Sequence, residues 1–460
     1  MRSIQIGGML MEEVQAFLSG RIWLKDHTPF PSAVIDQFID KGFITPHKGI
    51  QTHRISRILQ TNINQCRRCG CRQLTTFHCA KCNGPCLYCR HCIRMGRVSS
   101  CTELITWTGP TIEHLTPHKF NWSGTLTSGQ SRASEELLES IHQNKSHLVH
   151  AVCGAGKTEL LFPAVFDLLT RGKRVCVATP RTDVVLELAP RFQQVFPATT
   201  IHALYGGSPG HTNYAELIIA TTHQLLRFEA AFDVVFVDEA DAFPYTIDDS
   251  LQFAVQKAKR KDAVVHYITA TPSHELLQKV DNISLISERF HGFPLPVPRF
   301  DGLWNYDKHI KKGRLSPKIQ SWTQQCLENK RPFLIFFPTI DLMEQALPLF
   351  QQLDPQILAV HAEDPNRKEK VVELRMKKVP GLLTTTILER GITIPNVQVA
   401  VVGADETIFT SSALIQIGGR VGRSVDYPKG DLVFFHHGIS FAMDKAKATI
   451  ETHNAKREKS

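Results

Sequence analysis

The sequence lacks any uninterrupted apolar run of about 18 residues, the length that a membrane-spanning helix requires. Its first residues also lack the apolar core of a signal peptide, because the acidic pair Glu12 and Glu13 comes early. No self-similarity occurs at a period of about 20–50 residues, which excludes a solenoid of repeats. We therefore expect a cytoplasmic protein without a transmembrane segment, for which any role at a membrane would be peripheral.

The composition is that of a globular protein with several domains. The chain has 460 residues, of which 42% are hydrophobic and 21% are charged. This length exceeds what one compact core usually serves, so we expect roughly two or three domains. The formal net charge is +9 and the pI is about 8.9. The positive charge suits a polyanionic partner, although basic enzymes without one are common.

Cysteine is concentrated in one short segment. Of the 12 cysteines, eight lie between Cys66 and Cys92. Disulfide-stapled secreted proteins are normally small with cysteines throughout, whereas one local cluster in a long chain indicates a cytosolic metal site. Two C-x-x-C pairs, Cys66 with Cys69 and Cys89 with Cys92, have the spacing of a tetrahedral zinc ribbon. Basic neighbours favour nucleic acid as its partner: Arg67, Arg68, Arg72, Lys81, Arg90, Arg94 and Arg97.

Four further cysteines in this segment, Cys71, Cys79, Cys82 and Cys86, leave the number of zinc ions open. They could build a second four-cysteine site, exchange with the ligands of the first, or stay free. Ribbons of this size fold only with metal and usually serve binding rather than catalysis.

Apolar strands alternate with amphipathic helices behind the cysteine segment, which predicts parallel sheets covered on both faces. The proline-rich stretch 290–298 separates two such series and indicates a linker. We therefore predict an α/β fold with two tandem lobes, at residues 106–292 and 293–460. Ahead of them come residues 1–60, of unknown role, and a zinc-binding module at 61–105. The predicted strands are 146–152, 174–179, 217–221, 234–237 and 264–268, then 332–337, 357–361, 381–385, 397–402 and 430–435.

A phosphate-binding loop occupies residues 151–158, with the sequence Ala-Val-Cys-Gly-Ala-Gly-Lys-Thr. It follows an apolar strand and opens a helix, which is the context that this motif requires. Backbone N–H groups of Cys153, Gly154, Ala155 and Gly156 would cradle phosphate oxygens. The Lys157 ammonium would contact the β- and γ-phosphates, and the Thr158 hydroxyl would ligate Mg²⁺.

Carboxylates follow a second apolar strand in the run 234–241, Val-Val-Phe-Val-Asp-Glu-Ala-Asp. Asp238 emerges at the carboxyl edge of the sheet, where nucleotides bind. We expect Asp238 to hold Mg²⁺ through water, and Glu239 to orient or deprotonate the attacking water. These residues indicate ATP hydrolysis.

Several further patterns match superfamily 2 helicases. The letters Asp-Glu-Ala-Asp, followed by Thr269-Ala-Thr271, match motifs II and III, and residues 416–423, Gln-Ile-Gly-Gly-Arg-Val-Gly-Arg, match motif VI. The resemblance implies two RecA-like lobes, with Arg420 and Arg423 stabilising charge on the transferring phosphoryl group. The remaining implied roles are coupling of nucleotide state to the nucleic-acid track by Thr269, Thr271, Thr385 and Gly391, and reading of adenine by Gln130.

Polar turns at strand ends of the first lobe could line a nucleic-acid track. They contain Pro180, Arg181, Gly206, Gly207, Thr221 and Thr222, in the order of motifs Ia, Ib and Ic. Hydroxyls, backbone N–H groups and helix N-termini suit phosphate oxygens and carry no sequence information. We therefore expect binding that is independent of nucleic-acid sequence.

The combination of zinc ribbon and motor resembles the late competence protein ComFA family of transformable Gram-positive bacteria. The resemblance rests on the cysteine pairs, on Ala178-Thr-Pro-Arg-Thr-Asp-Val-Val-Leu-Glu-Leu-Ala189, on Thr221-Thr-His-Gln-Leu-Leu-Arg227 and on Thr384-Thr-Thr-Ile-Leu-Glu-Arg-Gly391. It implies a DNA-dependent ATPase at the inner face of the cell membrane, which drives single-stranded DNA uptake during transformation. The implied cofactors are ATP, Mg²⁺ and Zn²⁺, and the implied partners are single-stranded DNA, ComFC and the uptake channel.

Three alternatives remain. A replication-restart helicase of the primosomal type also pairs cysteine knuckles with such a motor, but it carries them between its lobes. RNA unwinding is suggested by the Asp-Glu-Ala-Asp letters, although Gln416 departs from the motif VI of that group. A zinc DNA-docking protein without enzymatic activity would keep the ribbon and treat the motor as inert.

Overall fold

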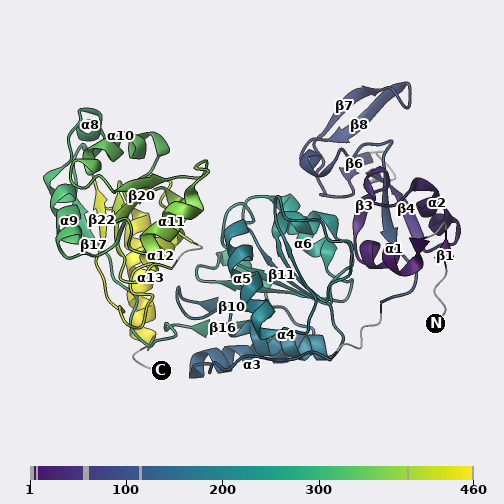
Figure 1. The fold of residues 1–460 in the computed structure, drawn as a ribbon, viewed down its shortest axis with the longest axis horizontal. Helices are drawn as coiled ribbons and strands as arrows, with labels where there is room; N and C mark the ends of the chain where they lie inside the picture. Colours follow the sequence, from purple (N-terminus) through teal and green to yellow (C-terminus); the bar gives the residue numbers. More distant parts are fainter. Residues whose placement is uncertain (1–4, 7–8, 55–61, 113–116, 391–392, 458–460) are drawn as a thin grey trace. The chain divides into compact units, whose positions relative to one another are not determined.

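The computed structural model describes residues 5–6, 9–54, 62–112, 117–390 and 393–457. The chain divides into two compact units (Figure 1). The first comprises residues 1–149 and 158–284, and the second comprises residues 150–157 and 285–460. The segment 150–157, which holds most of the phosphate-binding loop, thus groups with the second unit.

No helix in the described part of the chain has both the length and the apolar character needed to cross a membrane.

A seven-stranded sheet has the order β12-β13-β11-β14-β15-β10-β16. Strand β11 pairs in parallel with both β13 and β14, and the pairings of β12 with β13 and of β14 with β15 are also parallel. Its strands are β10 (His147–Ala151), β11 (Val175–Thr179), β12 (Ile201–Leu204), β13 (Leu217–Thr221), β14 (Val234–Asp238), β15 (Val265–Thr269) and β16 (Asn282–Ile286). The central strands are buried along their whole length, which explains their continuous apolar sequences. All five predicted strands are confirmed, and β12 and β16 were missed.

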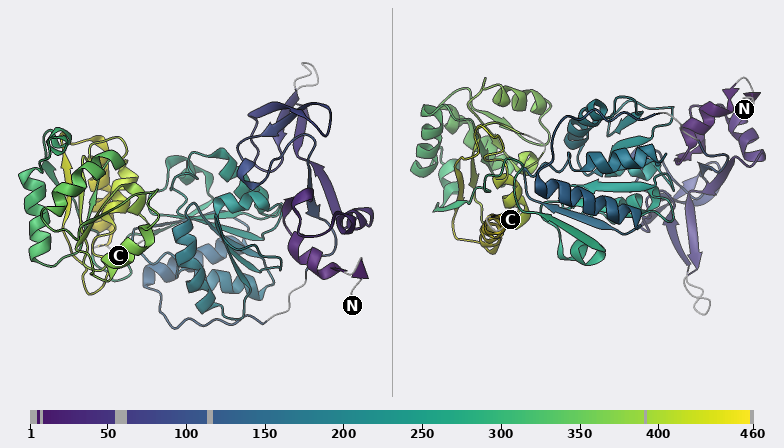
Figure 2. Two further views of the ribbon diagram at one scale, coloured as in Figure 1. Left: turned by 45° about the horizontal axis from the view of Figure 1, so that its top comes forward. Right: turned by 90° about the horizontal axis from the view of Figure 1, so that it is seen from below.

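Helices follow the strands of this sheet (Figure 2). They are α3 (Ser128–His142), α4 (Leu161–Thr170), α5 (Thr182–Val195), the 3-10 helix η3 (Thr222–Arg227), α6 (Asp249–Ala258) and α7 (His274–Lys279). Helix α4 begins only at Leu161, so Lys157 and Thr158 lie in the turn before it rather than in the helix.

The second unit contains a six-stranded sheet of order β17-β22-β21-β18-β20-β19, and all its pairings are parallel. Its strands are β17 (Arg299–Gly302), β18 (Phe333–Phe336), β19 (Leu358–Val360), β20 (Gly381–Thr384), β21 (Gln398–Val402) and β22 (Leu432–His436). Its helices are α8 (Tyr306–Lys311), α9 (Pro317–Glu328), α10 (Ile340–Gln351), α11 (Arg367–Arg375), the 3-10 helix η4 (Thr386–Leu388), α12 (Ser411–Gly418) and α13 (Phe441–Arg457). The predicted strands are confirmed, and only the edge strand β17 was missed. The two parallel-sheet lobes are of the RecA-like type.

The N-terminal region encloses the cysteine segment between paired strands. Strands β3 (Ile22–Leu24) and β4 (Ile44–Lys48) flank β9 (Glu103–Trp107) in an antiparallel sheet, covered by α1 (Met11–Leu18) and α2 (Ser32–Asp40). The cysteine segment leaves this sheet through β5 (Ile50–Arg54) and β6 (Asn62–Cys66) and forms the hairpin of β7 (Leu74–Cys79) and β8 (Gly84–Cys89). A short β1–β2 pairing (Gln5–Ile6, Met9–Leu10) precedes α1, and the 3-10 helices η1 (Lys25–His27) and η2 (Ile93–Met95) complete the region.

This region packs firmly on the seven-stranded sheet within the first unit. Apolar residues of β3 and the buried cysteines share one core with residues of β11, β13 and α6. The Arg174 guanidinium donates to the Ser19 carbonyl at 2.8 Å, and the Glu229 N–H donates to the Gly20 carbonyl at 3.0 Å. Gly20 adopts a φ of +69°, and a Cβ there would come within 2.6 Å of Ala231 Cβ. Residues 1–60 therefore serve, at the least, to join the cysteine segment to the lobe.

Candidate nucleotide, zinc and nucleic-acid sites

The phosphate-binding loop has the backbone that its glycines permit. Gly154 and Gly156 adopt φ values of +85° and +72°, which residues with a Cβ rarely reach. The Ala155 N–H donates to the Val152 carbonyl at 3.2 Å, so the loop turns sharply after β10. Such a turn presents successive backbone N–H groups, the feature that makes loops of this kind bind phosphate.

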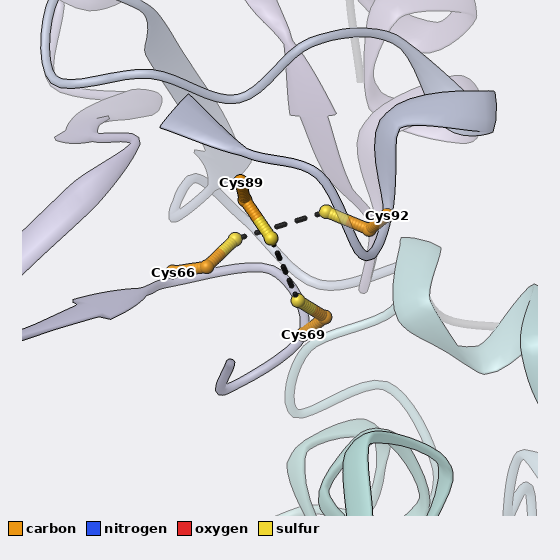
Figure 3. A group of neighbouring side chains, drawn as sticks. All are labelled: Cys66, Cys69, Cys89 and Cys92. Atoms are coloured by element: carbon orange, nitrogen blue, oxygen red, sulfur yellow. Dashed lines mark hydrogen bonds between the residues drawn. The ribbon is translucent and has the colours of Figure 1, made fainter. Parts of the chain in front are cut away.

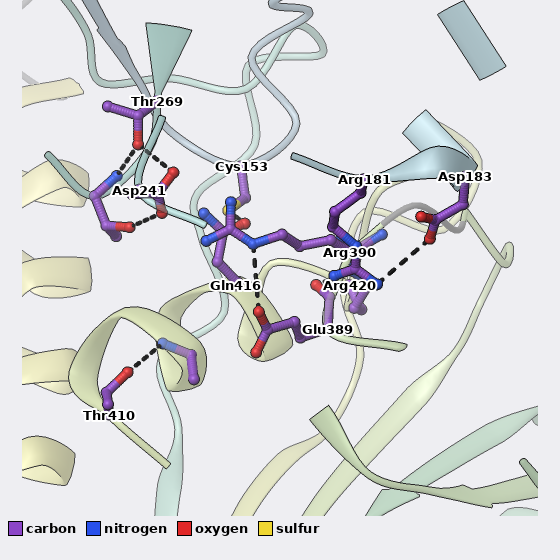
Figure 4. A network of polar contacts seen from close by, with 12 residues as sticks. Cys153, Arg181, Asp183, Asp241, Thr269, Glu389, Arg390, Thr410, Gln416 and Arg420 are labelled. Atoms are coloured by element: carbon purple, nitrogen blue, oxygen red, sulfur yellow. Dashed lines mark hydrogen bonds and ion pairs between the residues drawn. The ribbon is translucent and has the colours of Figure 1, made fainter. Parts of the chain in front are cut away.

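Within the second unit, this loop contacts the predicted motif VI. The Cys153 thiol donates to Gln416 Oε1 at 3.1 Å, and Gly419 packs against the Cys153 side chain (Figure 4). Both contact residues of motif VI lie at or beside the C-terminus of α12. The loop and motif VI thus form one packed segment.

Arg289 also lies beside the loop and was missed in the sequence. Its side chain packs on Gly154, and its Nη1 donates to the carbonyls of Val421 and Gly422 at 2.8 and 2.6 Å. Arg289 is 1% exposed, and burial lowers its pKa to about 10. No sequence signal marks it, because it follows an edge strand and belongs to none of the motifs.

The carboxylates predicted to serve Mg²⁺ and water lie where β14 ends. Asp238 is the last residue of that strand, and its Oδ1 accepts from the Glu239 N–H at 2.9 Å. Glu239 has a φ of +54°, a left-handed conformation that residues with side chains seldom adopt. Backbone strain of this kind concentrates at functional sites, because the surrounding structure must enforce it.

Asp241 links the second and third motifs. Its carboxylate accepts a hydrogen bond from the Thr269 hydroxyl (Figure 4) and another from the Thr271 hydroxyl. The Thr271 N–H donates to the Thr269 hydroxyl at 3.1 Å. Thr269 closes β15, next to β14 in the sheet. The last letter of Asp-Glu-Ala-Asp was not among the predicted site residues, yet it holds the two predicted coupling threonines.

Two further predicted residues of the nucleotide site already have protein partners. The Thr158 hydroxyl accepts from Arg191 Nη1 at 3.3 Å, and Arg191 also pairs with Glu159. Gln130 is buried, and its Oε1 accepts from the Thr127 N–H at 2.8 Å in a capping box at the start of α3. Gln130 therefore fixes the helix start, whether or not it also reads adenine.

The two predicted motif VI arginines, Arg420 and Arg423, belong to the second unit, as does the motif V residue Thr385. Arg420 is buried, and its Nε donates to the Glu389 carbonyl at 2.8 Å, while Arg423 Nε donates to the Gly419 carbonyl at 3.0 Å. Thr385 caps η4. Gly391 lies outside the described residues.

Four cysteines converge at the base of the β7–β8 hairpin (Figure 3). The Sγ atoms of Cys66 and Cys92 are 3.7 Å apart, and those of Cys69 and Cys89 are 3.5 Å apart. Four thiolates at about 2.3 Å from a tetrahedral Zn²⁺ stand about 3.8 Å from one another. All four side chains are buried, so the predicted set has the composition and spacing of a zinc site.

Arg68, between the first two cysteines, is the counter-charge of this cluster. It is 3% exposed, and its Nε and Nη2 donate to Cys92 Sγ at 3.3 and 3.2 Å. Hydrogen bonds from Cys66 and Cys69, together with the charge of Arg68, lower the pKa of Cys92. The Arg68 carbonyl accepts from Lys257 Nζ at 2.7 Å, which ties the cluster to α6.

The other cysteines do not group as the sequence suggested. Cys79, Cys82 and Cys86 converge with Cys101, whereas Cys71 lies apart, with its thiol 3.6 Å from the Gln73 carbonyl. Cys101 lies within the predicted module 61–105 but was not among the predicted zinc ligands.

A groove in the first unit collects most of the predicted nucleic-acid residues. We define it, as the nucleic-acid groove, by a cavity of about 760 Å³ lined by Pro180, Gly206, Gly207 and Thr221 from the lobe, and by residues of the N-terminal region. Arg181 does not line it and pairs with Asp183 at 3.4 Å, and Thr222 is fully buried.

Comparison with known proteins resolves the family. Residues 8–106 match the family model of the competence protein ComFA N-terminal domain. The competence protein ComFA of Bacillus subtilis (strain 168) is 42% identical over 447 residues, covering 96% of this chain and 95% of the relative. ComFA of Streptococcus pneumoniae (strain ATCC BAA-255 / R6) is 40% identical, covering 82% of this chain and 90% of that protein.

The chain belongs to the ComFA family.

The rest of this ComFA family chain matches helicase-type models. Residues 123–274 match the res subunit of type III restriction enzymes, and residues 317–425 match the helicase conserved C-terminal domain. Saccharomyces cerevisiae Dbp5 bound to RNA and ADP BeF3 has a TM-score of 0.51 at 16% identity, covering 71% of this chain and 91% of that one. RecG bound to a three-way DNA junction has a TM-score of 0.52 at 16% identity, covering 75% of this chain and 49% of that one. These likenesses show that the two lobes share the fold of those structures.

Proposed function

We propose that this ComFA family member is an ATP-driven motor that moves along single-stranded DNA and powers its uptake during natural transformation. The observation that carries the proposal is the conjunction of a glycine-turned phosphate loop after β10 with carboxylates after β14 of the same sheet. Ligands of α/β sheets bind beyond the carboxyl ends of the strands, so both elements suit one nucleotide.

In the proposed reaction, Lys157 binds the β- and γ-phosphates, and Asp238 orients the hydrated metal. Bound Mg²⁺ supplies charge neutralisation on the phosphates. Glu239 orients the attacking water and accepts its proton, while Arg420 and Arg423 stabilise negative charge on the phosphoryl group.

Coupling to DNA would run through Asp241. Its carboxylate joins the end of β14 to Thr269 and Thr271, so a change at the phosphates can reach the strand ends nearby. Thr221 ends β13 in that sheet and lines the nucleic-acid groove. The turns at this edge offer hydroxyls and backbone N–H groups, which suit DNA phosphates of any sequence.

The cluster of Cys66, Cys69, Cys89 and Cys92 would hold one structural Zn²⁺. The close fit of the sulfur separations to a tetrahedral site supports this assignment, as does the Arg68 charge beside Cys92. By likeness to the family, the protein would work in the cytoplasm at the inner face of the membrane, with ComFC and the uptake channel as partners.

The proposal is tested by measuring ATP hydrolysis with single-stranded DNA, duplex DNA and RNA. We expect single-stranded DNA to stimulate hydrolysis most, and Lys157→Ala to lower the stimulated rate by at least about 100-fold. Lys378→Ala, which removes an exposed lysine, serves as the matched control. Equal hydrolysis by wild type and Lys157→Ala would contradict the motor, and equal stimulation by RNA would contradict the choice of DNA.

The role in uptake needs a cellular experiment. Labelled DNA should fail to enter cells that lack the protein, and entry should return with wild type but not with Glu239→Gln. Normal entry in the deleted strain would refute the uptake role while leaving the ATPase assignment intact.

A further inference from the structure

The tip of the β7–β8 hairpin carries a second group of four cysteines. The Sγ atoms of Cys79, Cys82, Cys86 and Cys101 all lie within 4.8 Å of one another. Cys79 Sγ and Cys101 Sγ are 3.6 Å apart, close to the separation of about 3.8 Å expected between thiolates on one tetrahedral Zn²⁺.

The backbone brings these residues together from distant positions. Cys79 ends β7 opposite Gly84, and Cys82 lies in the hairpin turn between them. The segment that ends at Cys101 runs beside β8, where the Ser100 N–H donates to the Leu87 carbonyl at 2.9 Å and Tyr88 bridges to Ser99. This pairing places Cys101 next to the hairpin and excludes Cys71, which lies at its other end.

The hairpin has little else to hold it. Two-stranded hairpins are marginally stable alone, and small modules without a core usually need metal or disulfides. Its described apolar contacts are few, and the main aromatic one is the edge-on pair of Phe77 with Tyr88. A metal at the tip would fix both strands to the segment before β9.

We propose that Cys79, Cys82, Cys86 and Cys101 bind a second Zn²⁺, separate from the one at Cys66, Cys69, Cys89 and Cys92. The chain would then hold two zinc ions, one at the base of the hairpin and one at its tip.

Zinc content of the full-length protein, measured by elemental mass spectrometry, tests this proposal. We expect two zinc ions per chain in wild type, matching the two cysteine groups. The double variant Cys86→Ser with Cys101→Ser should retain one, and so should Cys66→Ser with Cys69→Ser. The matched control Cys71→Ser should retain two. One zinc in wild type, or zinc loss in Cys71→Ser without loss in Cys101→Ser, would overturn the proposal.

A second readout guards against misfolded variants. Cobalt exchanged into wild type and into Cys66→Ser with Cys69→Ser should give the intense thiolate-to-cobalt absorption of a four-sulfur site in both proteins. Absence of that band from the variant, or a Cys79–Cys101 disulfide found by mass spectrometry in freshly purified protein, would refute the site.

The nucleic-acid groove supports an independent inference, which rests on the proposed function. One wall consists of turns of the lobe, and the other contains Phe17, Trp23 and Arg94 of the N-terminal region. Arg227 of the lobe lies over the Trp23 ring, with its guanidinium carbon 4.9 Å from the ring centre. Arg21 lies over Phe17 at 4.6 Å.

The half-buried Trp23 ring and the exposed Arg94 suit single-stranded DNA, whereas Phe17 and Arg21 are buried. Bases stack on aromatic faces without regard to sequence, and arginines meet the phosphates between them. Trp23 is anchored for that task, because its indole N–H donates to the His27 carbonyl at 2.9 Å. Arg94 is exposed at the groove, directly after the cysteine knuckle that ends at Cys92.

We infer that the N-terminal region forms the second wall of the DNA path, with Trp23 stacking a base and Arg94 contacting a phosphate. The zinc ribbon then acts on DNA by positioning Arg94 opposite the turns of the lobe.

Binding of a fluorescent oligothymidylate to the full chain tests this inference. We expect Arg94→Ala and Trp23→Ala each to weaken binding by roughly 5-fold or more. The matched controls are Arg90→Ala, an exposed arginine of the same ribbon outside the groove, and Trp304→Phe, a tryptophan that is 72% exposed.

The outcomes separate this inference from the motor itself. Crosslinks from iodouracil-substituted DNA should map to Trp23 in wild type. This measurement needs no variant, so misfolding of a variant cannot affect it. If wild type binds DNA but the groove variants bind equally well and crosslinks fall elsewhere, the inference fails alone. If wild type neither binds DNA nor responds to it, the proposed function fails with it.

Discussion

The Cys153 thiol donates a hydrogen bond to Gln416 Oε1 at 3.1 Å, so the phosphate-binding loop contacts motif VI within the second unit. The backbone next to Gln416 also packs tightly against the Cys153 side chain. A Cβ on Gly419 would lie only 2.4 Å from Cys153 Cβ, although Gly419 itself has ordinary helical backbone angles.

Gly419→Ala should therefore impair ATP hydrolysis although glycine has no functional group. Overpacking of this kind costs about 1–3 kcal/mol, so we expect a loss of roughly 10-fold or more in kcat/KM for ATP. Gly438→Ala, where an added Cβ meets nothing within 4 Å, is the control. Steady-state kinetics in which both variants match wild type would show that this packing is irrelevant to the nucleotide.

Arg289→Ala should raise the KM for ATP. The change removes a buried cation beside Gly154 and the hydrogen bonds that it donates to the Val421 and Gly422 carbonyls. Loss of charged hydrogen bonds costs about 1.5–3 kcal/mol, so we expect an increase of roughly 10-fold or more. The KM of Arg289→Lys should lie between those of wild type and Arg289→Ala. An unchanged KM in both variants would exclude Arg289 from the nucleotide site.

Asp241→Ala should separate nucleotide binding from DNA response. Without the carboxylate, the hydroxyls of Thr269 and Thr271 lose their common acceptor. We expect ATP to bind nearly as in wild type, while stimulation of hydrolysis by single-stranded DNA falls by roughly 10-fold. Asp241→Asn should retain part of the stimulation, and full stimulation in Asp241→Ala would rule out this coupling route.

Much of the motor could be predicted from local sequence, because its chemistry depends on short segments. The glycines of the phosphate loop, and Asp238 after a buried strand, need no knowledge of distant residues. Within the two lobes, the strands that were missed are β12, β16 and β17, which all lie at sheet edges, where fewer residues are buried.

The remaining features depend on long-range pairing that no local pattern reveals. Cys101 joins Cys79 because its segment runs beside β8. Trp23 lines the nucleic-acid groove because β3, which precedes the cysteine segment in the sequence, pairs with β9, which follows it.

Lys257 predicts a pH dependence of stability. Burial lowers its pKa to about 8, while the unfolded chain keeps it near 10.5. Between these values the unfolded state binds more protons than the folded state, so stability rises with pH through this window. Lys257→Met lacks this titration.

Relative to Lys257→Met, wild type should therefore gain about 2 kcal/mol of unfolding free energy between pH 7.5 and 9.5. Denaturant unfolding of both proteins at the two pH values measures the difference, and the shared titration of other groups cancels. If the unfolding free energies of the two proteins differed by the same amount at both pH values, Lys257 would not be buried against the Arg68 and Leu226 carbonyls, to which its Nζ donates.

The central claim is movement along single-stranded DNA driven by ATP, and displacement of streptavidin from end-biotinylated oligonucleotides tests it most directly. Wild type should displace streptavidin from one end of a single strand in the presence of ATP. Lys157→Ala should not do so, nor should wild type without ATP. Failure at both ends, or equal displacement by Lys157→Ala, would contradict the account.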